Sequence, residues 1–360
     1  EVIEGKGTVG VVCAGAAYQH VAEALPDASI FKLGVTWPLP AAALRDFADS
    51  VEAVYVVEEG SEYLKDAVRA CGVPVSDTPC PLPRAGELSP GLVRAAFGLE
   101  EPACLPMPDD VPGRPPALCA GCPHRLVFKE LSRMRAIVTG DIGCYTLGAL
   151  PPLSAMDTTV DMGASVSMAH GFELALAGTE HRPVVAVIGD STFIHSGITG
   201  LIDIAYNQSN SVVIILDNSI TGMTGHQQNP TTGYNIKGDP TTAVDLEALC
   251  KAVGIKRVRV CDPYNLKEVE TVLKEELAAE EPSVIISRRP CALLKYVKHK
   301  PSLVVDTEKC IGCKACLGIG CPAISVHGGK AAIDRTQCVG CGVCTTLCPK
   351  SAITEQEVQA

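Results

Sequence analysis

The segment 183–224 constrains the fold more than any other stretch of this sequence. Its two short apolar runs, residues 184–188 and 212–216, are rich in β-branched residues and predict buried parallel strands. The apolar residues between the runs recur at helical spacing, so the whole segment predicts a βαβ unit. Because both strands end at one edge of the sheet, the turns at 189–191 and 217–219 should lie side by side.

The side chains of these two turns suit a metal-bound diphosphate. Asp190 and Asn218 offer hard oxygen atoms to a divalent cation, usually Mg²⁺. Gly189 allows the backbone to approach a ligand closely, and the hydroxyl and N–H groups nearby suit phosphate oxygens. Gly-Asp, then a helix, then Asn resembles the thiamine diphosphate motif, although Ser191 stands where that motif has a second glycine. The alternative is an ordinary βαβ crossover with polar strand ends.

Length and composition indicate a soluble α/β protein of two or three domains. The chain has 360 residues, of which 47% are hydrophobic, 20% charged and 4% aromatic. A formal net charge of −11 argues against nucleic acid as the main partner. No apolar run approaches the ~20 residues that cross a bilayer, and no signal sequence is evident, so we expect a cytoplasmic protein without a membrane partner. The first residue is Glu1 rather than Met, which suggests a fragment.

The first hundred residues predict a small doubly wound α/β domain. Strands expected at 8–14, 29–33 and 53–57 alternate with helices expected at 16–25, 41–49 and 61–70. The Gly15 turn is more typical of a plain tight turn than of a phosphate site. Glu58 and Glu59, at the end of the third strand, are expected to be solvated surface acids. The proline-rich residues 101–117 then predict an extended linker.

A second domain is expected over residues 118–300. Cys119-x-x-Cys122 and His124 invite a zinc interpretation, but no second Cys/His pair follows at finger spacing. A Gly-Cys-Pro turn into a helix at 124–133 is the better account, with His124 presented to a ligand. Further turns at 140–145 and 160–164 follow predicted strands, and the second leads into a helix at 165–177. Four glycine-bearing turns would then crowd one sheet edge, as a large cofactor requires.

These motifs resemble a known family. They are Gly-Cys-Pro-His (121–124), Asp-Ile-Gly-Cys-Tyr (141–145), Asp-Met-Gly (161–163), Gly-Asp-Ser (189–191) and Asp-Asn-Ser-Ile-Thr-Gly-Met-Thr-Gly (217–225). They look like the thiamine-binding half of the 2-oxoacid:ferredoxin oxidoreductases, and most of all like the α subunits of the indolepyruvate enzymes. Residues 1–100, with Lys32-Leu33-Gly34 and Pro38-Leu39-Pro40, resemble the family's middle domain, which is transketolase C-terminal-like.

The resemblance implies a set of site residues. Asp190, Asn218 and the carbonyl of Ile220 would hold Mg²⁺, and His124 and Cys144 are the catalytic candidates. Met162 and Gly163 would lie near the pyrimidine, and the residues around Gly143 near the diphosphate and thiazolium. The full set expected around the cofactor is Gly121, Cys122, Ile142, Gly143, Cys144, Met162, Gly163, Gly189, Asp190, Ser191, Thr221, Gly222, Met223 and Thr224.

The rest of this domain predicts helices at 244–253 and 266–279 and strands at 256–260 and 283–287. A basic run follows, comprising Arg288, Arg289 and the residues 295–300. A solvated rim is its ordinary explanation. Attraction of an anionic substrate or of a cofactor's phosphates is the alternative.

The cysteines of residues 301–360 carry the strongest motif. Cys310-x₂-Cys313-x₂-Cys316-x₄-Cys321-Pro and Cys338-x₂-Cys341-x₂-Cys344-x₃-Cys348-Pro have the spacing of a two-cluster ferredoxin, in which the fourth cysteine of each run ligates the other cluster. The first [4Fe–4S] cluster would take Cys310, Cys313, Cys316 and Cys348, and the second Cys338, Cys341, Cys344 and Cys321. The first run has one extra residue. A domain of about fifty residues has little core, so the clusters would hold its fold.

The family implies oxidative decarboxylation of an aryl 2-oxo acid, with coenzyme A as acyl acceptor, a β subunit as partner and ferredoxin as electron acceptor. It also implies an activating glutamate from a preceding pyrimidine-binding domain, so we expect no turnover from these residues alone. Pyruvate or a branched-chain 2-oxo acid as substrate, a non-oxidative thiamine decarboxylase and a pure electron-transfer module are the alternatives.

Overall fold

The computed structural model describes residues 1–100, 103, 106–111, 113 and 115–355. The chain divides into two compact units, Glu1–Pro112 and Gly113–Ala360. The boundary falls inside the predicted linker, residues 101–117, part of which lies outside the described residues. In the described part of the chain, no helix has the length and apolar character that a membrane span needs.

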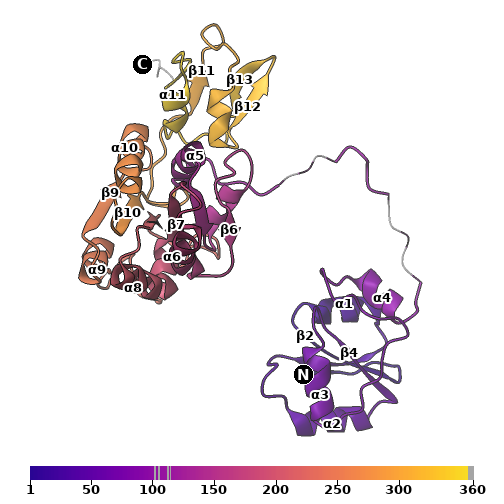
Figure 1. Ribbon diagram of the computed structural model, residues 1–360. Helices are drawn as coiled ribbons and strands as arrows, with labels where there is room; N and C mark the ends of the chain where they lie inside the picture. Colours follow the sequence, from indigo (N-terminus) through magenta and orange to yellow (C-terminus); the bar gives the residue numbers. More distant parts are fainter. Residues whose placement is uncertain (101–102, 104–105, 112, 114, 356–360) are drawn as a thin grey trace. The chain divides into compact units, whose positions relative to one another are not determined.

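The first unit is a four-stranded sheet with two helices on each face (Figure 1). The alternating pattern predicts three of these strands and three of these helices, but not β1 or α4. The strand order is β1-β3-β2-β4, with β1 antiparallel to β3 and the others parallel. Apolar side chains of α1 and α4 pack on one face, and those of α2 and α3 on the other. The elements are β1 (Val2–Ile3), β2 (Val9–Ala14), α1 (Ala17–Ala24), β3 (Ser29–Leu33), α2 (Ala41–Asp49), β4 (Ala53–Val57), α3 (Tyr63–Ala70) and α4 (Pro90–Ala96).

Two glutamates of this unit have structural roles that the sequence does not reveal. The Glu58 carboxylate accepts N–H hydrogen bonds from Leu64 and Lys65, at 2.7 and 2.9 Å, and so caps the first turn of α3. Glu59 accepts from the backbone N–H of Leu88 at 2.7 Å. Glu59 is exposed, as predicted, and Glu58 is half-buried, but both carboxylates also satisfy backbone donors of later segments.

The second unit is built on a six-stranded parallel sheet of order β6-β5-β7-β8-β10-β9. Side chains alternate between its faces: Val212, Ile214 and Leu216 of β8 join one core, and Val213 and Ile215 the other. Both faces are covered, which is why these strands read as continuous apolar runs. The strands are β5 (Ile137–Gly140), β6 (Thr158–Thr159), β7 (Val184–Gly189), β8 (Val212–Asp217), β9 (Arg257–Cys261) and β10 (Ser283–Arg288).

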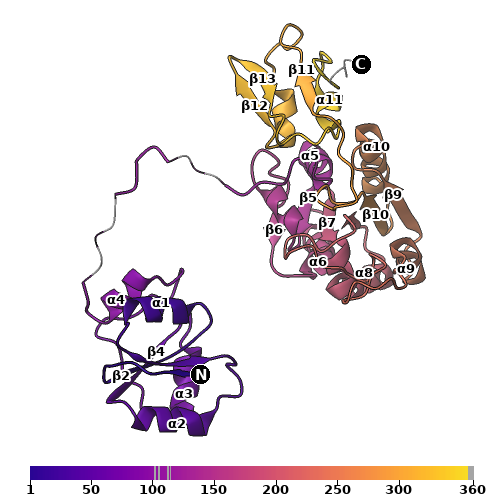
Figure 2. The same cartoon turned by 180° about the vertical axis from the view of Figure 1, so that it is seen from behind.

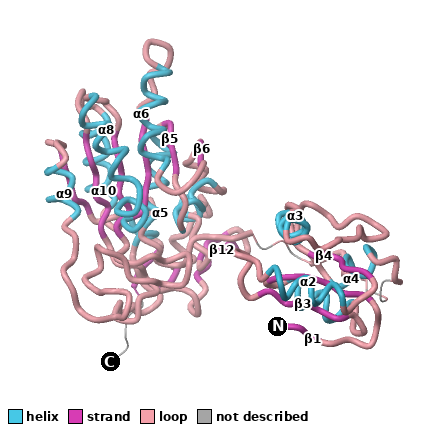
Figure 3. The backbone as a smooth tube through the Cα atoms, turned by 90° about the horizontal axis from the view of Figure 1, so that it is seen from below, coloured by secondary structure: helices cyan, strands magenta, loops and turns pink. Residues whose placement is uncertain are grey.

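Helices α5 and α10 cover the first of these faces, and α6, α8 and α9 the second. Figure 3 shows the loops of the unit gathered at one end of its strands and helices. After β7 the chain enters α7 and then a π-helical turn, Phe193–Gly197, before α8 begins, so the helical segment starts earlier than the sequence predicts. The helices are α5 (His124–Met134), α6 (Ala164–Leu176), α7 (Asp190–Thr192), α8 (Ile198–Asn207), α9 (Leu246–Ala252) and α10 (Leu266–Leu277).

The cysteine-rich segment packs beside α5 and α10 as part of the second unit (Figures 1 and 2). Ile319, Ile324 and Val343 join the same core cluster as Leu126 and Phe128 of α5. Apolar contacts with the neighbouring sheet domain therefore stabilise the segment, in addition to the clusters that its cysteines are expected to bind. Its elements are two antiparallel pairs and a helix: β11 (Leu303–Val305) with β14 (Ile353–Glu355), β12 (Ile324–His327) with β13 (Lys330–Ile333), and α11 (Val343–Leu347).

Candidate functional site

One cavity at the carboxyl edge of the second sheet gathers most of the predicted cofactor residues. It lies where β7 and β8 end, and the turns after β5 and before α6 also reach it. Tyr145, Thr192 and Leu216 line it too, and the sequence analysis did not anticipate them. The predicted residues that line it are His124, Ile142, Gly143, Cys144, Met162, Gly189, Asp190, Ser191, Asn218, Ile220, Thr221, Gly222, Met223 and Thr224.

The metal-binding candidates form a buried corner of this cavity. Asp190 is 2% exposed and Asn218 7%. Burial raises the pKa of Asp190 to about 7, and the nearby charge of Asp217 acts in the same direction. A buried carboxylate in this state favours a cation beside it. Carboxylate, amide and carbonyl oxygens from Asp190, Asn218 and Ile220 are the ligand types that Mg²⁺ prefers, so the residues fit such an ion.

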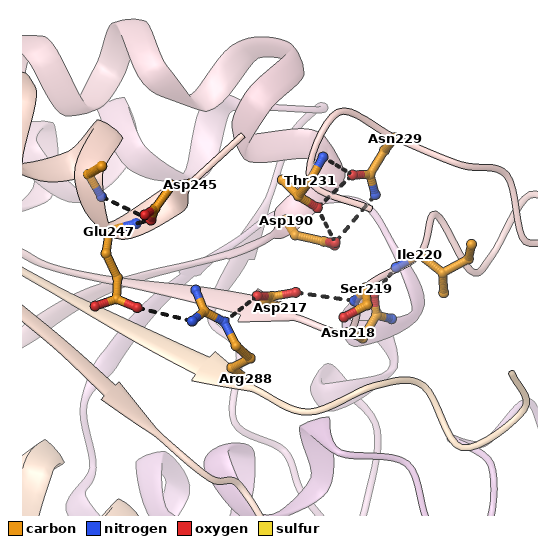
Figure 4. A network of polar contacts seen from close by, with 11 residues as sticks. Asp190, Asp217, Asn218, Ser219, Ile220, Asn229, Thr231, Asp245, Glu247 and Arg288 are labelled. Carbon is orange, nitrogen blue, oxygen red and sulfur yellow. Dashed lines mark hydrogen bonds and ion pairs between the residues drawn. The ribbon is translucent and has the colours of Figure 1, made fainter. Parts of the chain in front are cut away.

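Two further residues hold Asp190 in place (Figure 4). Asn229 Nδ2 and the Thr231 hydroxyl donate to Asp190 Oδ2 at 3.3 and 3.2 Å. Both belong to the Asn-Pro-Thr-Thr-Gly loop, whose turn residues were the available sequence signal. The sequence analysis missed them because nothing local shows that this loop folds back over the end of β7.

Glycines make room for a tyrosine wedge between two turns. A Cβ atom at Gly143 would lie 2.4 Å from the Tyr145 ring, and one at Gly189 would lie 2.7 Å from it. Tyr145 is itself 4% exposed, and its hydroxyl donates to the carbonyl of Ile142 at 2.9 Å. The ring therefore fixes the spacing of the turns that follow β5 and β7. Only glycine at positions 143 and 189 leaves room for the ring.

Asp141 joins two of the turns that surround the cavity. Its buried carboxylate accepts from the N–H groups of Ile142 at 2.8 Å, Gly163 at 2.9 Å and Ser165 at 3.2 Å. Gly163 is the N-cap of α6 and has no side chain to cap the helix, so Asp141 supplies that cap from a distant segment. Gly163 does not line the cavity; it positions its neighbour Met162, which does.

The two catalytic candidates are uncharged as free side chains at neutral pH. Burial lowers the pKa of His124 to about 4, so its imidazole is neutral. His124 Nε2 lies 3.5 Å from Asn218 Nδ2, and the ring meets Tyr145 edge to face at 6.0 Å. Burial likewise raises the pKa of the Cys144 thiol, with nearby cysteines as a smaller cause. As free side chains, both are suited to hydrogen bonding rather than to acting as an imidazolium acid or a thiolate nucleophile.

The eight ferredoxin-type cysteines surround two separate cavities. One is lined by Cys310, Cys313, Cys316 and Cys348, the other by Cys321, Cys338, Cys341 and Cys344. These are the two ligand sets that the spacing predicts, with the fourth cysteines exchanged. In the described part of the chain, no three His, Cys, Asp or Glu side chains converge closely enough for one metal ion. Four thiols around a space suit a cubane, whose irons lie apart, so the residues fit [4Fe–4S] clusters.

Comparison with known proteins agrees with both sites. Residues 141–287 match the family described as thiamine pyrophosphate enzyme, C-terminal TPP binding domain, and residues 302–349 match the 4Fe-4S dicluster domain. Indolepyruvate oxidoreductase subunit IorA of Pyrococcus horikoshii is 37% identical over 96% of this chain, and that of Thermococcus kodakarensis is 38% identical over 97%. Over nearly its whole length, this chain is therefore similar to IorA subunits. It spans 60% and 61% of the length of these two relatives.

A solved structure of 2-oxoglutarate:ferredoxin oxidoreductase from Magnetococcus marinus aligns with 52% of this chain and 68% of its own, at 17% identity and a TM-score of 0.44. The recognition of the family and of the fold class from sequence is confirmed by the IorA relatives and by the two domain matches.

Besides Gly163, two more of the predicted cofactor residues lie elsewhere. Gly121 and Cys122 do not line the thiamine-type cavity; they line the second cysteine cavity, beside Cys321 and Cys341. The reason is geometric: the turn before α5 runs between the two cavities, so that His124 reaches one of them and the residues around it reach the other.

The two arginines of the basic run are neutralised. Arg288 Nε lies 2.7 Å from Asp217 Oδ2, and its Nη1 lies 3.0 Å from Glu247 (Figure 4). Arg289 pairs with Asp262 and stacks over Tyr264, with Cζ 4.0 Å from the ring centroid. The two arginines are therefore structural ion pairs, which the sequence run does not distinguish from a solvated rim or an anion site.

Proposed function

We propose that this chain is the catalytic and electron-transferring part of an enzyme that oxidises an aryl 2-oxo acid. The reaction is RCOCOO⁻ + HSCoA → RCO–SCoA + CO₂ + H⁺ + two electrons, and the electrons leave through two [4Fe–4S] clusters to ferredoxin. The observation that carries the proposal is the position of the turn before α5. His124 lines the cavity with the diphosphate-type residues, and Arg125, its neighbour, lines the cavity of the second cysteine set.

Thiamine diphosphate and Mg²⁺ are proposed to occupy the cavity at the ends of β7 and β8. Asp190, Asn218 and the Ile220 carbonyl would hold the ion, while the hydroxyls of Ser191 and Thr221, 2.8 Å apart, would bind phosphate oxygens. When bound, thiamine diphosphate supplies a carbon nucleophile and electron sink for a 2-oxo acid, and the clusters supply one-electron acceptors.

His124 is proposed to bind the substrate as a neutral imidazole. Because burial lowers its pKa to about 4, the imidazole offers a hydrogen bond while it remains uncharged. A positive charge there would stabilise the substrate carboxylate and so oppose its loss as CO₂. Asn218 beside it and Tyr145 against its ring restrict its orientation. The side chain therefore positions a carboxylate or carbonyl rather than transferring a proton.

The preference for an aryl side chain has a basis in the cavity. Met162 and Met223 line it and are 47% and 52% exposed, so two polarisable thioethers are accessible there. Thioethers make favourable contacts with aromatic rings and adapt to large ones. The names of the IorA relatives, indolepyruvate oxidoreductase, point the same way.

The test uses the complete protein together with its partner subunit, which we propose to be of the β type. The enzyme is assayed anaerobically with thiamine diphosphate, Mg²⁺, coenzyme A and either ferredoxin or a viologen dye. The value of kcat/KM for reduction of the acceptor should be higher with indolepyruvate and phenylpyruvate than with pyruvate, 2-oxoglutarate or 2-oxoisovalerate. Release of CO₂ without reduction of the acceptor would instead identify a non-oxidative decarboxylase. A preference for 2-oxoisovalerate would refute the aryl assignment alone.

A further inference from the structure

Arg125 is a buried arginine with no acidic partner. It is 4% exposed, and within the described ranges of the chain no carboxylate lies within 4.0 Å of it. Its guanidinium donates to backbone carbonyls from two distant segments. The acceptors are the carbonyls of Leu118, Cys119, Ile319 and Gly320, and the bond to Ile319 is 3.1 Å long.

Carbonyl groups satisfy the hydrogen-bond donors of a guanidinium but do not cancel its charge. Other arginines of the unit are neutralised: Arg257 by the buried Glu276 at 2.8 Å, and Arg289 by Asp262. Taking an unpaired cation out of water is costly, so a buried arginine normally has an anion beside it. The missing anion is the feature that requires an explanation.

The surroundings of Arg125 supply one. Arg125 lines the same cavity as Cys321, Cys338, Cys341 and Cys344. A [4Fe–4S] cluster with four thiolates is an anion in both redox states, and each electron adds one negative charge.

We propose that Arg125 is the counter-ion of the second cluster and raises its reduction potential, so that this cluster accepts electrons readily from the neighbouring active site. The role in electron transfer rests on the proposed function, whereas the role as counter-ion is argued from the unpaired charge of Arg125 and from the cavity that it lines. A fixed cation in a low-dielectric site favours the more negative, reduced state of the cluster. Arg125 is thus a positioning and tuning residue rather than a catalytic one.

The competing explanation is a mechanical clip. The same guanidinium joins the segment before α5 to the turn at Ile319 and Gly320, and a purely structural arginine would do no more. Lysine separates the two roles, because it keeps the positive charge but lacks the planar fork that reaches four carbonyls. Removal of the charge and removal of the fork then have different consequences.

The experiment is an anaerobic redox titration of the complete protein with a chemical reductant, monitored by electron paramagnetic resonance. Arg125→Met should make one-electron reduction of one cluster at least about tenfold less favourable, a shift of about 59 mV to lower potential, without moving the other. Arg125→Lys should keep most of the wild-type potential even where it lowers the melting temperature. Arg335→Met, an exposed arginine three positions before Cys338, is the matched control and should shift neither cluster.

Unchanged potentials in an iron-loaded Arg125→Met protein would overturn the proposal. So would an equal shift in Arg125→Lys and Arg125→Met, since it would assign the effect to the clip. If Arg125→Met does not retain iron, Ala120→Asp tests the same charge effect with Arg125 in place, because Ala120 lines the same cavity. Ala120→Asp should lower the same potential, and no shift would refute the inference. Absence of both clusters from the wild-type protein would instead defeat the proposed function.

Discussion

The carboxylate of Asp141 offers the sharpest test of how the thiamine-type cavity is assembled. Asp141→Asn keeps the size of the side chain but replaces one carboxylate oxygen by an NH₂ group and removes the charge. The two oxygens together accept from Ile142, Gly163 and Ser165, and all three N–H groups need an acceptor in a site with no exposed surface. At least one of them would then face a donor.

The cost follows from these bonds. A hydrogen bond to a charged group contributes about 1.5–3 kcal/mol, and an unsatisfied buried donor costs about 1–3 kcal/mol. Loss of the negative charge at the N-terminus of α6 adds about 0.3–1 kcal/mol. Because these terms overlap, we expect local destabilisation of about 3 kcal/mol, concentrated where the turn after β5 meets the start of α6.

Hydrogen exchange measured by mass spectrometry is the suitable assay. The single tryptophan, Trp37, lies exposed in the first unit, so its fluorescence does not report on this site. A chain of two units also does not yield one free energy of unfolding. Amides of residues 141–145 and 163–168 should exchange about a hundredfold faster in Asp141→Asn, and calorimetry should show weaker binding of thiamine diphosphate with Mg²⁺.

Asp161→Asn is the matched control, since Asp161 is exposed in the turn before α6 and its loss should change stability by less than about 0.5 kcal/mol. Wild-type exchange rates and cofactor affinity in Asp141→Asn would show that the two turns are held by packing instead, and the reasoning would fail.

The remaining predictions concern the metal corner, the tyrosine wedge and the clusters. Asp190→Asn should abolish Mg²⁺-dependent binding of thiamine diphosphate in calorimetry, as should chelation of the ion in the wild type; undiminished affinity would exclude Asp190 as a ligand. Gly189→Ala should destabilise the second unit by about 1–3 kcal/mol, because its Cβ would lie 2.7 Å from the Tyr145 ring, and combining it with Tyr145→Ala should recover part of the loss in thermal unfolding. Cys344→Ser should lower the iron content of the purified protein, whereas Cys80→Ser, at an exposed cysteine of the first unit, should not.

The fold and much of the site were predictable because their signals are local. A parallel strand covered on both faces is apolar at every position, so residues 184–188 and 212–216 stood out, and the edge at which they end follows from topology. The cysteine sets were predictable because spacing alone assigns each thiol to its cavity.

The residues that escaped prediction act over long separations. Asp141 caps a helix that begins 23 positions later in the sequence. Arg125 donates to the carbonyls of Ile319 and Gly320, which follow it by 194 and 195 positions. Neither belongs to a motif whose spacing encodes its partner, and a lone Asp or Arg in a glycine-rich turn has many ordinary explanations. Such roles become visible only when the partners' backbone groups are placed beside them.

The two cysteine cavities are not equivalent, and the difference bears on the direction of electron flow. The cavity of Cys310, Cys313, Cys316 and Cys348 is lined only by residues between Val305 and Ile353, that is, by its own segment. The other cavity shares its wall with Gly121, Cys122 and Arg125, one position from His124 in the thiamine-type cavity. If the proposed function holds, an electron leaving that cavity would reach the second cluster before the first, because the wall of the second cysteine cavity includes the neighbour of His124. Loss of the first cluster in Cys310→Ser should then leave the second cluster reducible by the 2-oxo acid substrate. Only the transfer of electrons to ferredoxin should be impaired.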